Sequence, residues 1–224
     1  MYPKTVICIN GDKPQTMIAL IKQAESETKA PIFEIRADYL KKDDLIYKTL
    51  EKIRNSSGRK LIFTLRKKDE GGMQDLDDRV RKNIFLDAID LKFDYIDVEF
   101  SSSKKLLTIL NNRKFSSIIL SYHNFDKTDQ KDIENHYRAI KLLNPDIIKI
   151  VTLAKSDKDN KIVEDILIKY RTQSPPLVCF CMGEKGKMSR INGYKLGNAL
   201  TYLALGDKST TASGQLTYKE FLAI

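Results

Sequence analysis

Residues 33–38 read FEIRAD and alternate apolar with ionisable side chains. Alternation with a period of two is typical of a β-strand, because successive side chains point to opposite faces. One face of this strand is apolar, and the other carries Glu34, Arg36 and Asp38. A central strand of an open parallel sheet is covered by helices on both faces and is apolar throughout. An ionisable face instead favours a strand whose second face meets the interior of a barrel.

Later parts of the chain repeat this alternation. Asp97 and Glu99 share one face of a predicted strand, and Ser121 shares a face with His123 in another. We interpret the two carboxylates as part of a buried salt-bridge network, since such networks line barrel interiors. The repeated pattern favours a closed (β/α)8 barrel, the TIM barrel, over an open doubly wound sheet.

Eight strands alternating with helices are predicted along the chain. The strands are the apolar runs Thr5–Asn10, Pro31–Asp38, Lys60–Arg66, Asp94–Phe100, Ser116–Phe125, Pro145–Ala154, Pro175–Gly183 and Asn198–Ala204. The helices are the amphipathic stretches Gln15–Glu27, Asp43–Asn55, Asp77–Lys92, Ser103–Asn112, Asp129–Leu143 and Lys158–Gln173. Because no linker rich in proline or glycine divides them, we predict one barrel domain over residues 1–224, with its ligand site at the carboxyl ends of the strands.

Composition narrows the class of protein. The chain has 224 residues, 42% hydrophobic and 31% charged, which excludes a disordered tail and a disulfide scaffold. The net charge of +9 raises nucleic acid as a partner. Arg79, Arg81 and Lys82 follow acidic residues, however, and we interpret such mixed charge as a solvated face without a nucleic-acid partner. No apolar run reaches the roughly 20 residues that span a bilayer, so we expect no membrane partner and a cytoplasmic location.

The cysteines and glycines carry no strong motif. Cys179 and Cys181 are separated by one residue, with no histidine or second cysteine pair nearby, so we predict buried strand thiols and no metal site. The glycines between residues 183 and 189 have neither the spacing nor the hydroxyl residue of a phosphate-binding loop.

Lys149 is the most informative residue, because it interrupts the otherwise apolar run at residues 146–153. Burying an ammonium group is costly, and burial favours the neutral amine. A neutral, positioned amine is what Schiff-base formation with a ketone requires. The alternative is a lysine on an edge strand that reaches water.

Two further kinds of residue complete the candidate site. His123 lies where a predicted strand opens into its loop and suits proton transfer near neutral pH, although a purely structural histidine is the alternative. His136, the other histidine, is interpreted as a surface residue. Arg36, Arg66 and Arg190 offer guanidinium forks for a carboxylate, unless they serve only in buried salt bridges. These residues predict a carbonyl-directed reaction on an anionic substrate, without separating an aldolase from a dehydratase.

At these positions the chain resembles type I 3-dehydroquinate dehydratases. The resemblance rests on motifs that occur in family order: Phe33–Asp38, Phe63–Arg66 followed by Glu70–Gly72, Tyr95–Glu99, Ser121–Phe125, Lys149, Met182–Arg190 and Thr211–Gln215. Each motif is weak alone, and together they are highly specific. The resemblance implies a lyase of the shikimate pathway, which leads to chorismate and the aromatic amino acids, with 3-dehydroquinate as its substrate.

The resemblance also implies the roles of individual residues. Lys149 would form an imine with the substrate, His123 would act as acid and base, and Glu70 would orient His123. Substrate-binding roles fall to Glu34, Arg36, Arg66, Arg190, Thr211, Gln215, Met182, Tyr202 and, at a position where the family has serine, Cys8. The family uses no metal or organic cofactor, and its members usually form homodimers. The loop at residues 211–215 departs from the family by carrying Thr211 for serine and Ser213 for proline.

The main alternative is another class I Schiff-base barrel, such as an aldolase. It would share Lys149 but not the ordered arginine and loop motifs.

Overall fold

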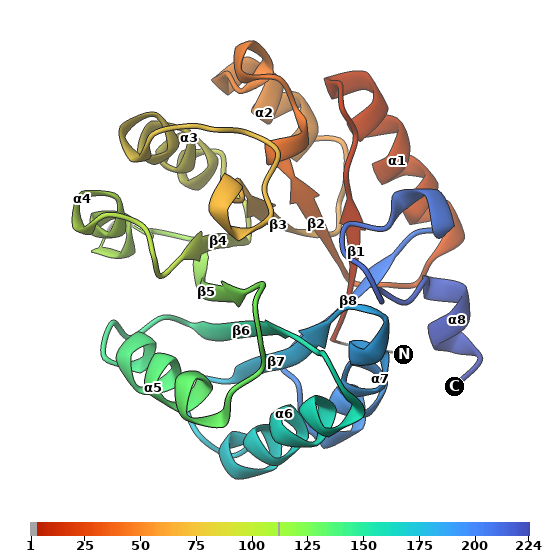
Figure 1. Cartoon of the computed structure of the whole chain (residues 1–224). Coiled ribbons are helices and arrows are strands. Elements are labelled where there is room, and N and C mark those ends of the chain that lie inside the picture. The colour runs from red at the N-terminus through yellow and green to blue at the C-terminus, as the bar shows by residue number, and fades with distance from the viewer. Residues whose placement is uncertain (1–3, 112) are drawn as a thin grey trace. The chain divides into compact units, whose positions relative to one another are not determined.

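The structure, a computed structural model, describes residues 4–111 and 113–224. The described residues form two compact units, one up to residue 118 and one over residues 119–224. The elements of the first unit, in chain order, are β1 (Thr5–Ile9), α1 (Pro14–Glu27), β2 (Ile32–Arg36), α2 (Tyr47–Arg54), β3 (Lys60–Thr64), α3 (Asp78–Asp90), β4 (Tyr95–Glu99) and α4 (Lys104–Leu107). In Figure 1, α1, α2 and α3 lie along one side of the strands of this unit.

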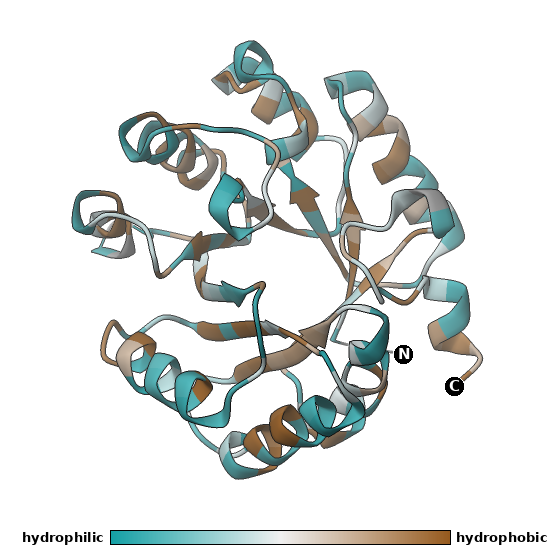
Figure 2. Ribbon diagram, viewed as in Figure 1, coloured by the Kyte–Doolittle hydropathy of each residue, from teal (hydrophilic) through white to brown (hydrophobic). Residues whose placement is uncertain are grey.

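The second unit continues the same alternation. Its elements are β5 (Ser117–Asn124, which begins at the end of the first unit), α5 (Gln130–Lys141), β6 (Ile147–Leu153), α6 (Asp157–Tyr170), β7 (Leu177–Met182), α7 (Lys187–Leu196), β8 (Thr201–Ala204) and α8 (Tyr218–Leu222). Figure 2 shows β6 and β7 mostly as hydrophobic, whereas α5 and α6 mix hydrophobic with hydrophilic residues. α5 and α6 therefore each pack one apolar stripe inward and leave a polar face outward.

The strands follow the order β7-β6-β5-β4-β3-β2-β1-β8, and the strand pairs described in detail are parallel. Eight such strands, each followed by a helix, make the fold a (β/α)8 barrel, as predicted.

The strand register of the first unit explains the alternation in the sequence. Glu34 pairs with Cys8 on one side and with Ile62 on the other. The intervening apolar residues Phe33 and Ile35 are fully buried. Near them, the ring of Phe63 meets Phe85 of α3 edge-on, with centroids 6.0 Å apart. The apolar face of these strands is thus the core against the helices.

In the second unit, β6 lies between β5 and β7. Lys149 pairs with Ser121 of β5 and with Val178 of β7. Lys149 is therefore on an inner strand, and it is only 4% exposed. The alternative interpretation, a lysine on an edge strand that reaches water, is wrong. Beyond β7, the side chain of Asn198 accepts a hydrogen bond from the Cys179 amide at 2.7 Å and donates one to its carbonyl at 3.2 Å.

All eight strands occur where the sequence predicts them, and each is one to three residues shorter than predicted. The predicted helix Ser103–Asn112 is only one turn, Lys104–Leu107, followed by a 3-10 turn at Thr108–Asn111, and Asn112 lies outside the described residues. Two helices, α7 and α8, have no counterpart among the predicted ones. Cys179 and Cys181 are buried free thiols, as expected. None of the described helices is long and apolar enough to cross a membrane.

Candidate functional site

The second unit places Lys149 on one face of β6. Its ammonium nitrogen lies 4.1 Å from the centroid of the Tyr202 ring of β8. A ring face attracts a cation through its quadrupole, so this contact lowers the cost of burying the amine. The amine is thereby buried against an aromatic ring.

His123 lies on the same face of the sheet as Lys149. Ser121 is the register partner of Lys149, and His123 follows two residues later on β5, beside Val151. Because side chains two residues apart share a face, the imidazole and the amine lie on one face, one step apart along neighbouring strands. The imidazole is half-buried near the carboxyl end of its strand.

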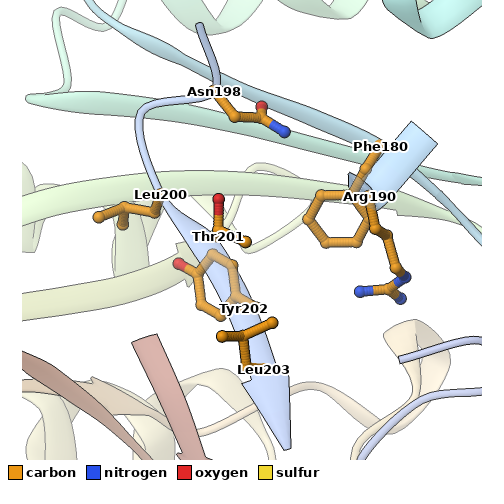
Figure 3. Close-up of a pocket in the computed structure, with 7 residues that line it drawn as sticks. All are labelled: Phe180, Arg190, Asn198, Leu200, Thr201, Tyr202 and Leu203. Carbon is orange, nitrogen blue, oxygen red and sulfur yellow. The ribbon is translucent and has the colours of Figure 1, made fainter. Parts of the chain in front are cut away.

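Arg190 comes from α7 rather than from a strand. Its guanidinium carbon lies 4.3 Å from the centroid of the Phe180 ring of β7. The rings of Phe180 and Tyr202 are in turn 6.4 Å apart. Figure 3 shows the Arg190 side chain beside Phe180, in a pocket that Tyr202 and residues of the β8 region also line. Lys149 and Arg190, two buried cations of this unit, thus lie on aromatic faces.

The loop after β8 is tied to the turn that precedes α7. Gln215 accepts hydrogen bonds from the amide of Thr211 at 2.8 Å and from its hydroxyl at 3.1 Å. Gly214 has a φ of +72°, and a side chain there would overlap the carbonyl of Gly183. Its amide donates to Glu184 at 3.1 Å. Met182 ends β7 just before this turn and is buried.

The first unit holds its predicted residues by polar contacts. Glu34 accepts a hydrogen bond from the Cys8 thiol at 3.1 Å and another from the Thr64 hydroxyl at 2.9 Å. Arg36 ends β2 and binds Asp38 through two parallel hydrogen bonds, each 2.8 Å long. Burial by itself lowers the pKa of Arg36, but the Asp38 carboxylate outweighs it and holds that pKa above its usual value.

Arg66 lies two residues beyond the end of β3, although the sequence predicts it inside the strand. Its guanidinium binds Asp97 and Glu99, both at 2.9 Å. Burial opposes the charge of Arg66, and the two carboxylates more than compensate, so its pKa is raised. The prediction that Asp97 and Glu99 belong to a buried salt-bridge network is confirmed.

Arg81 of α3 is part of the same network. It donates to the second carboxylate oxygen of Glu99, and it binds the Leu65 carbonyl at 3.1 Å and Asp78 at 2.7 Å. Arg81 is only 1% exposed, so the interpretation of its charge as part of a solvated face is wrong. The sequence contained one signal for this: Arg81 lies three and four residues before Ile84 and Phe85, the spacing that shares one face of a helix.

Glu70 closes a short 3-10 turn, Lys68–Glu70, after β3. It is buried and accepts a hydrogen bond of 2.5 Å from the hydroxyl of Ser101, a residue that sequence reasoning missed. The turn depends on Gly72, because a side chain there would overlap the carbonyl of Arg66. The local fold thus links the positions of Glu70 and Arg66.

Each unit therefore gathers its own share of the predicted residues. Lys149, Tyr202 and Arg190 lie around two aromatic rings in the second unit, and the carboxylates and arginines form hydrogen-bonded sets in the first. Among the described residues no group of three or more histidine, cysteine, aspartate or glutamate side chains is placed to hold a metal ion.

Comparison with known proteins agrees with the motifs. A family model of type I 3-dehydroquinase matches residues 5–224. The chain is 38% identical over 218 residues to a 3-dehydroquinate dehydratase of Pyrococcus abyssi, covering 96% of this chain and 94% of that protein. It is 32% identical to one of Streptococcus suis, covering 89% and 90%.

Solved structures agree in fold. The 3-dehydroquinate dehydratase of Aquifex aeolicus superposes with a TM-score of 0.78 at 28% identity, covering 98% of this chain and 96% of that one. That of Geobacillus kaustophilus superposes with a TM-score of 0.91 at 21% identity, covering 99% and 89%. The motifs, the fold and the sequence match lead to one conclusion: the chain belongs to the type I 3-dehydroquinase family.

Proposed function

We propose that this chain carries out the reaction of its family, the dehydration of 3-dehydroquinate to 3-dehydroshikimate in the shikimate pathway, through an imine on Lys149. The observation that carries the proposal is the placement of Lys149. Its amine is buried on β6, lies 4.1 Å from the Tyr202 ring and shares a sheet face with His123. An amine in such surroundings, one step from a proton carrier, is suited to attack a ketone.

In the first stage the Lys149 nitrogen attacks the C3 carbonyl of the substrate. A carbon–nitrogen bond forms, and His123 assists the proton transfers that let the carbonyl oxygen leave as water. The product is a cationic iminium, which withdraws electrons from the adjacent carbon and acidifies the proton at C2.

In the second stage His123 takes the C2 proton as general base. The electron pair of that bond forms an enamine, which expels the hydroxyl group at C1. The protonated His123 returns its proton to this hydroxyl, which leaves as a second water molecule. Water then hydrolyses the iminium, releasing 3-dehydroshikimate and the free amine of Lys149.

The remaining residues are assigned to binding. We assign the substrate carboxylate to Arg190, whose guanidinium fork suits bidentate recognition. Glu34, Arg36, Arg66 and Gln215 are assigned to the ring hydroxyls. Glu70 is assigned to orientation of His123. Thr211, Met182, Tyr202 and Cys8 complete the proposed contacts with the substrate.

The proposal extends to the whole chain. Residues 1–224 act as one catalytic domain, as a single family model over residues 5–224 supports. The reaction needs no metal and no organic cofactor. The chain works as a cytoplasmic homodimer, with the small-molecule substrate as its partner and with neither nucleic acid nor a membrane.

Borohydride trapping tests the proposal. Incubating the protein with 3-dehydroquinate and sodium borohydride reduces the imine to a stable amine, which intact mass and peptide mapping locate. We expect an adduct on Lys149 and loss of activity in proportion to it. Lys149→Ala is expected to lose turnover by on the order of 10⁴-fold, since the covalent route disappears.

The matched control is Lys155→Ala, which removes an exposed lysine two residues beyond β6. It should keep both turnover and the adduct. Turnover that survives Lys149→Ala undiminished contradicts the proposed mechanism. His123→Ala should lose most turnover and still trap some imine, and full activity in that variant would exclude His123 as the base.

A further inference from the structure

A polar cluster outside the proposed catalytic residues surrounds Asp132, in the first turn of α5. We call the set Tyr122, Asn124, Asp132 and His136 the Asp132 cluster. One oxygen of the Asp132 carboxylate accepts hydrogen bonds from the Tyr122 hydroxyl at 3.3 Å and from the Asn124 amide at 3.2 Å. The other oxygen lies 3.1 Å from Nδ1 of His136.

The members of the cluster also contact one another. The rings of Tyr122 and His136 are stacked, with centroids 3.6 Å apart and planes 9° from parallel. The Asn124 amide lies 3.4 Å from the Tyr122 hydroxyl. His136 is therefore not the plain surface residue that the sequence suggested, since its ring covers a tyrosine and faces a carboxylate.

Two members of the cluster flank His123 in the sequence. Tyr122 and Asn124 are the residues directly before and after it on β5. Because side chains alternate along a strand, both point to the face opposite the imidazole. That face is the one toward α5, where Asp132 holds them. A single carboxylate thus ties both neighbours of the proposed base to the adjacent helix.

The start of the following loop is fixed by the same residues. The side-chain oxygen of Asn124 accepts hydrogen bonds from the amides of Asp126 at 2.9 Å and Lys127 at 3.0 Å. Asp129 caps α5 by accepting from the Asp132 amide at 2.8 Å. The strand end, the loop and the first turn of the helix therefore form one hydrogen-bonded segment.

We infer that Asp132 is a positioning residue for His123. By holding Tyr122 and Asn124 on the opposite face of β5, it fixes the backbone on both sides of His123. The fixed backbone sets the direction of the imidazole. General base catalysis needs the base within hydrogen-bond reach of the proton, and a displacement of about 1 Å can reduce a rate about 10²-fold. This inference rests on the proposed function, because it assigns a support to the proposed base.

The test is Asp132→Ala, with turnover divided by the number of molecules that borohydride can trap as the Lys149 adduct; we call this quantity kcat per adduct site. The amount of adduct counts the molecules that still form the imine, so the division corrects for any loss of folded protein. We expect kcat per adduct site to fall by about ten- to a hundredfold with KM changed less than about threefold. Tyr122→Phe keeps the stacked ring and removes one hydrogen bond, and it should lower the same quantity by a smaller factor.

The matched control is Asp126→Ala in the same loop. The Asp126 side chain is exposed and pairs only at the surface with Lys155, so kcat per adduct site should equal that of the unaltered chain. An unchanged kcat per adduct site in both Asp132→Ala and Tyr122→Phe overturns the inference and leaves the proposed function intact. An unaltered chain without turnover or adduct overturns the proposed function and the inference with it.

Discussion

The two units hold their buried cations in different ways. In the first unit Arg36 binds Asp38, and Arg66 binds Asp97 and Glu99. In the second unit the ammonium of Lys149 lies over the Tyr202 ring, and the guanidinium of Arg190 lies over the Phe180 ring. A carboxylate neutralises the cation and fixes it by directed hydrogen bonds, whereas a ring attracts it without carrying a net charge.

This difference leads us to expect different roles for the cations of the two units. Arginines fixed by carboxylates give a rigid wall, which suits the hydroxyl recognition that we propose for them. A ring orients a side chain without adding a negative charge of its own, which suits both the proposed carboxylate clamp, Arg190, and the proposed nucleophile, Lys149, which attacks as the neutral amine. We therefore expect substitutions that break the buried network around Arg81 in the first unit to act mainly on stability, and substitutions at the rings of the second unit to act mainly on substrate binding and turnover.

The largest effect on stability is expected from Arg81→Met, which breaks the network of the first unit. It removes a cation that binds Glu99 and Asp78, and it leaves the Glu99 carboxylate buried with less compensation. Breaking a buried pair from one side costs about 3–5 kcal/mol, and the free energy of unfolding should fall by that amount. Denaturant unfolding measures it.

The control for Arg81→Met is Arg79→Met, two residues earlier on the same helix. Arg79 is exposed, so this variant should change the free energy of unfolding by less than about 0.5 kcal/mol. Equal unfolding curves for the two variants would show that the network does not stabilise the first unit.

A smaller effect is expected from Phe180→Leu, which removes the ring beside Arg190 in the second unit. A cation over the face of a ring is worth about 1 kcal/mol, so KM should rise about fivefold while kcat stays nearly constant. Steady-state kinetics measures the split. Phe180→Tyr keeps the ring and should keep KM, and a KM unchanged in Phe180→Leu would contradict a role of the ring in holding Arg190.

The same contrast explains which elements the sequence revealed. The strands of both units were predictable, because apolar and β-branched runs mark them whatever their second face carries. Helix α7 was not, because its buried residues are Ser189, Arg190 and Gly193 and it therefore lacks an apolar stripe. The helix that carries the proposed carboxylate clamp has a polar inner face, which periodicity cannot distinguish from a loop.

The local environments of the candidate residues were predictable to a similar extent, whereas their proposed roles stay predictions. The motifs gave Lys149 and the arginines, and single-residue alternation placed Asp97 and Glu99 on one inner face. Arg81 was assigned to the wrong environment, because charge interleaved along a helix indicates solvent unless a partner on another element is known. Its partner Glu99 is 18 residues away, on β4. Pairings of that kind come from tertiary structure rather than from local pattern.

The smallest expected effect concerns the three thiols, for which the two units again differ. Cys8 in the first unit donates to the Glu34 carboxylate. In the second unit burial raises the pKa of Cys179, and it raises that of Cys181 although nearby hydroxyl groups oppose it. A raised pKa keeps a thiol protonated at neutral pH, and only the thiolate reacts with iodoacetamide.

Intact mass should therefore show no adduct on Cys179 or Cys181 in the native protein and three adducts per chain after denaturation. Rapid modification of either in the native state would mean that β7 opens to solvent, so that the rings of the second unit would no longer hold their cations in a fixed place.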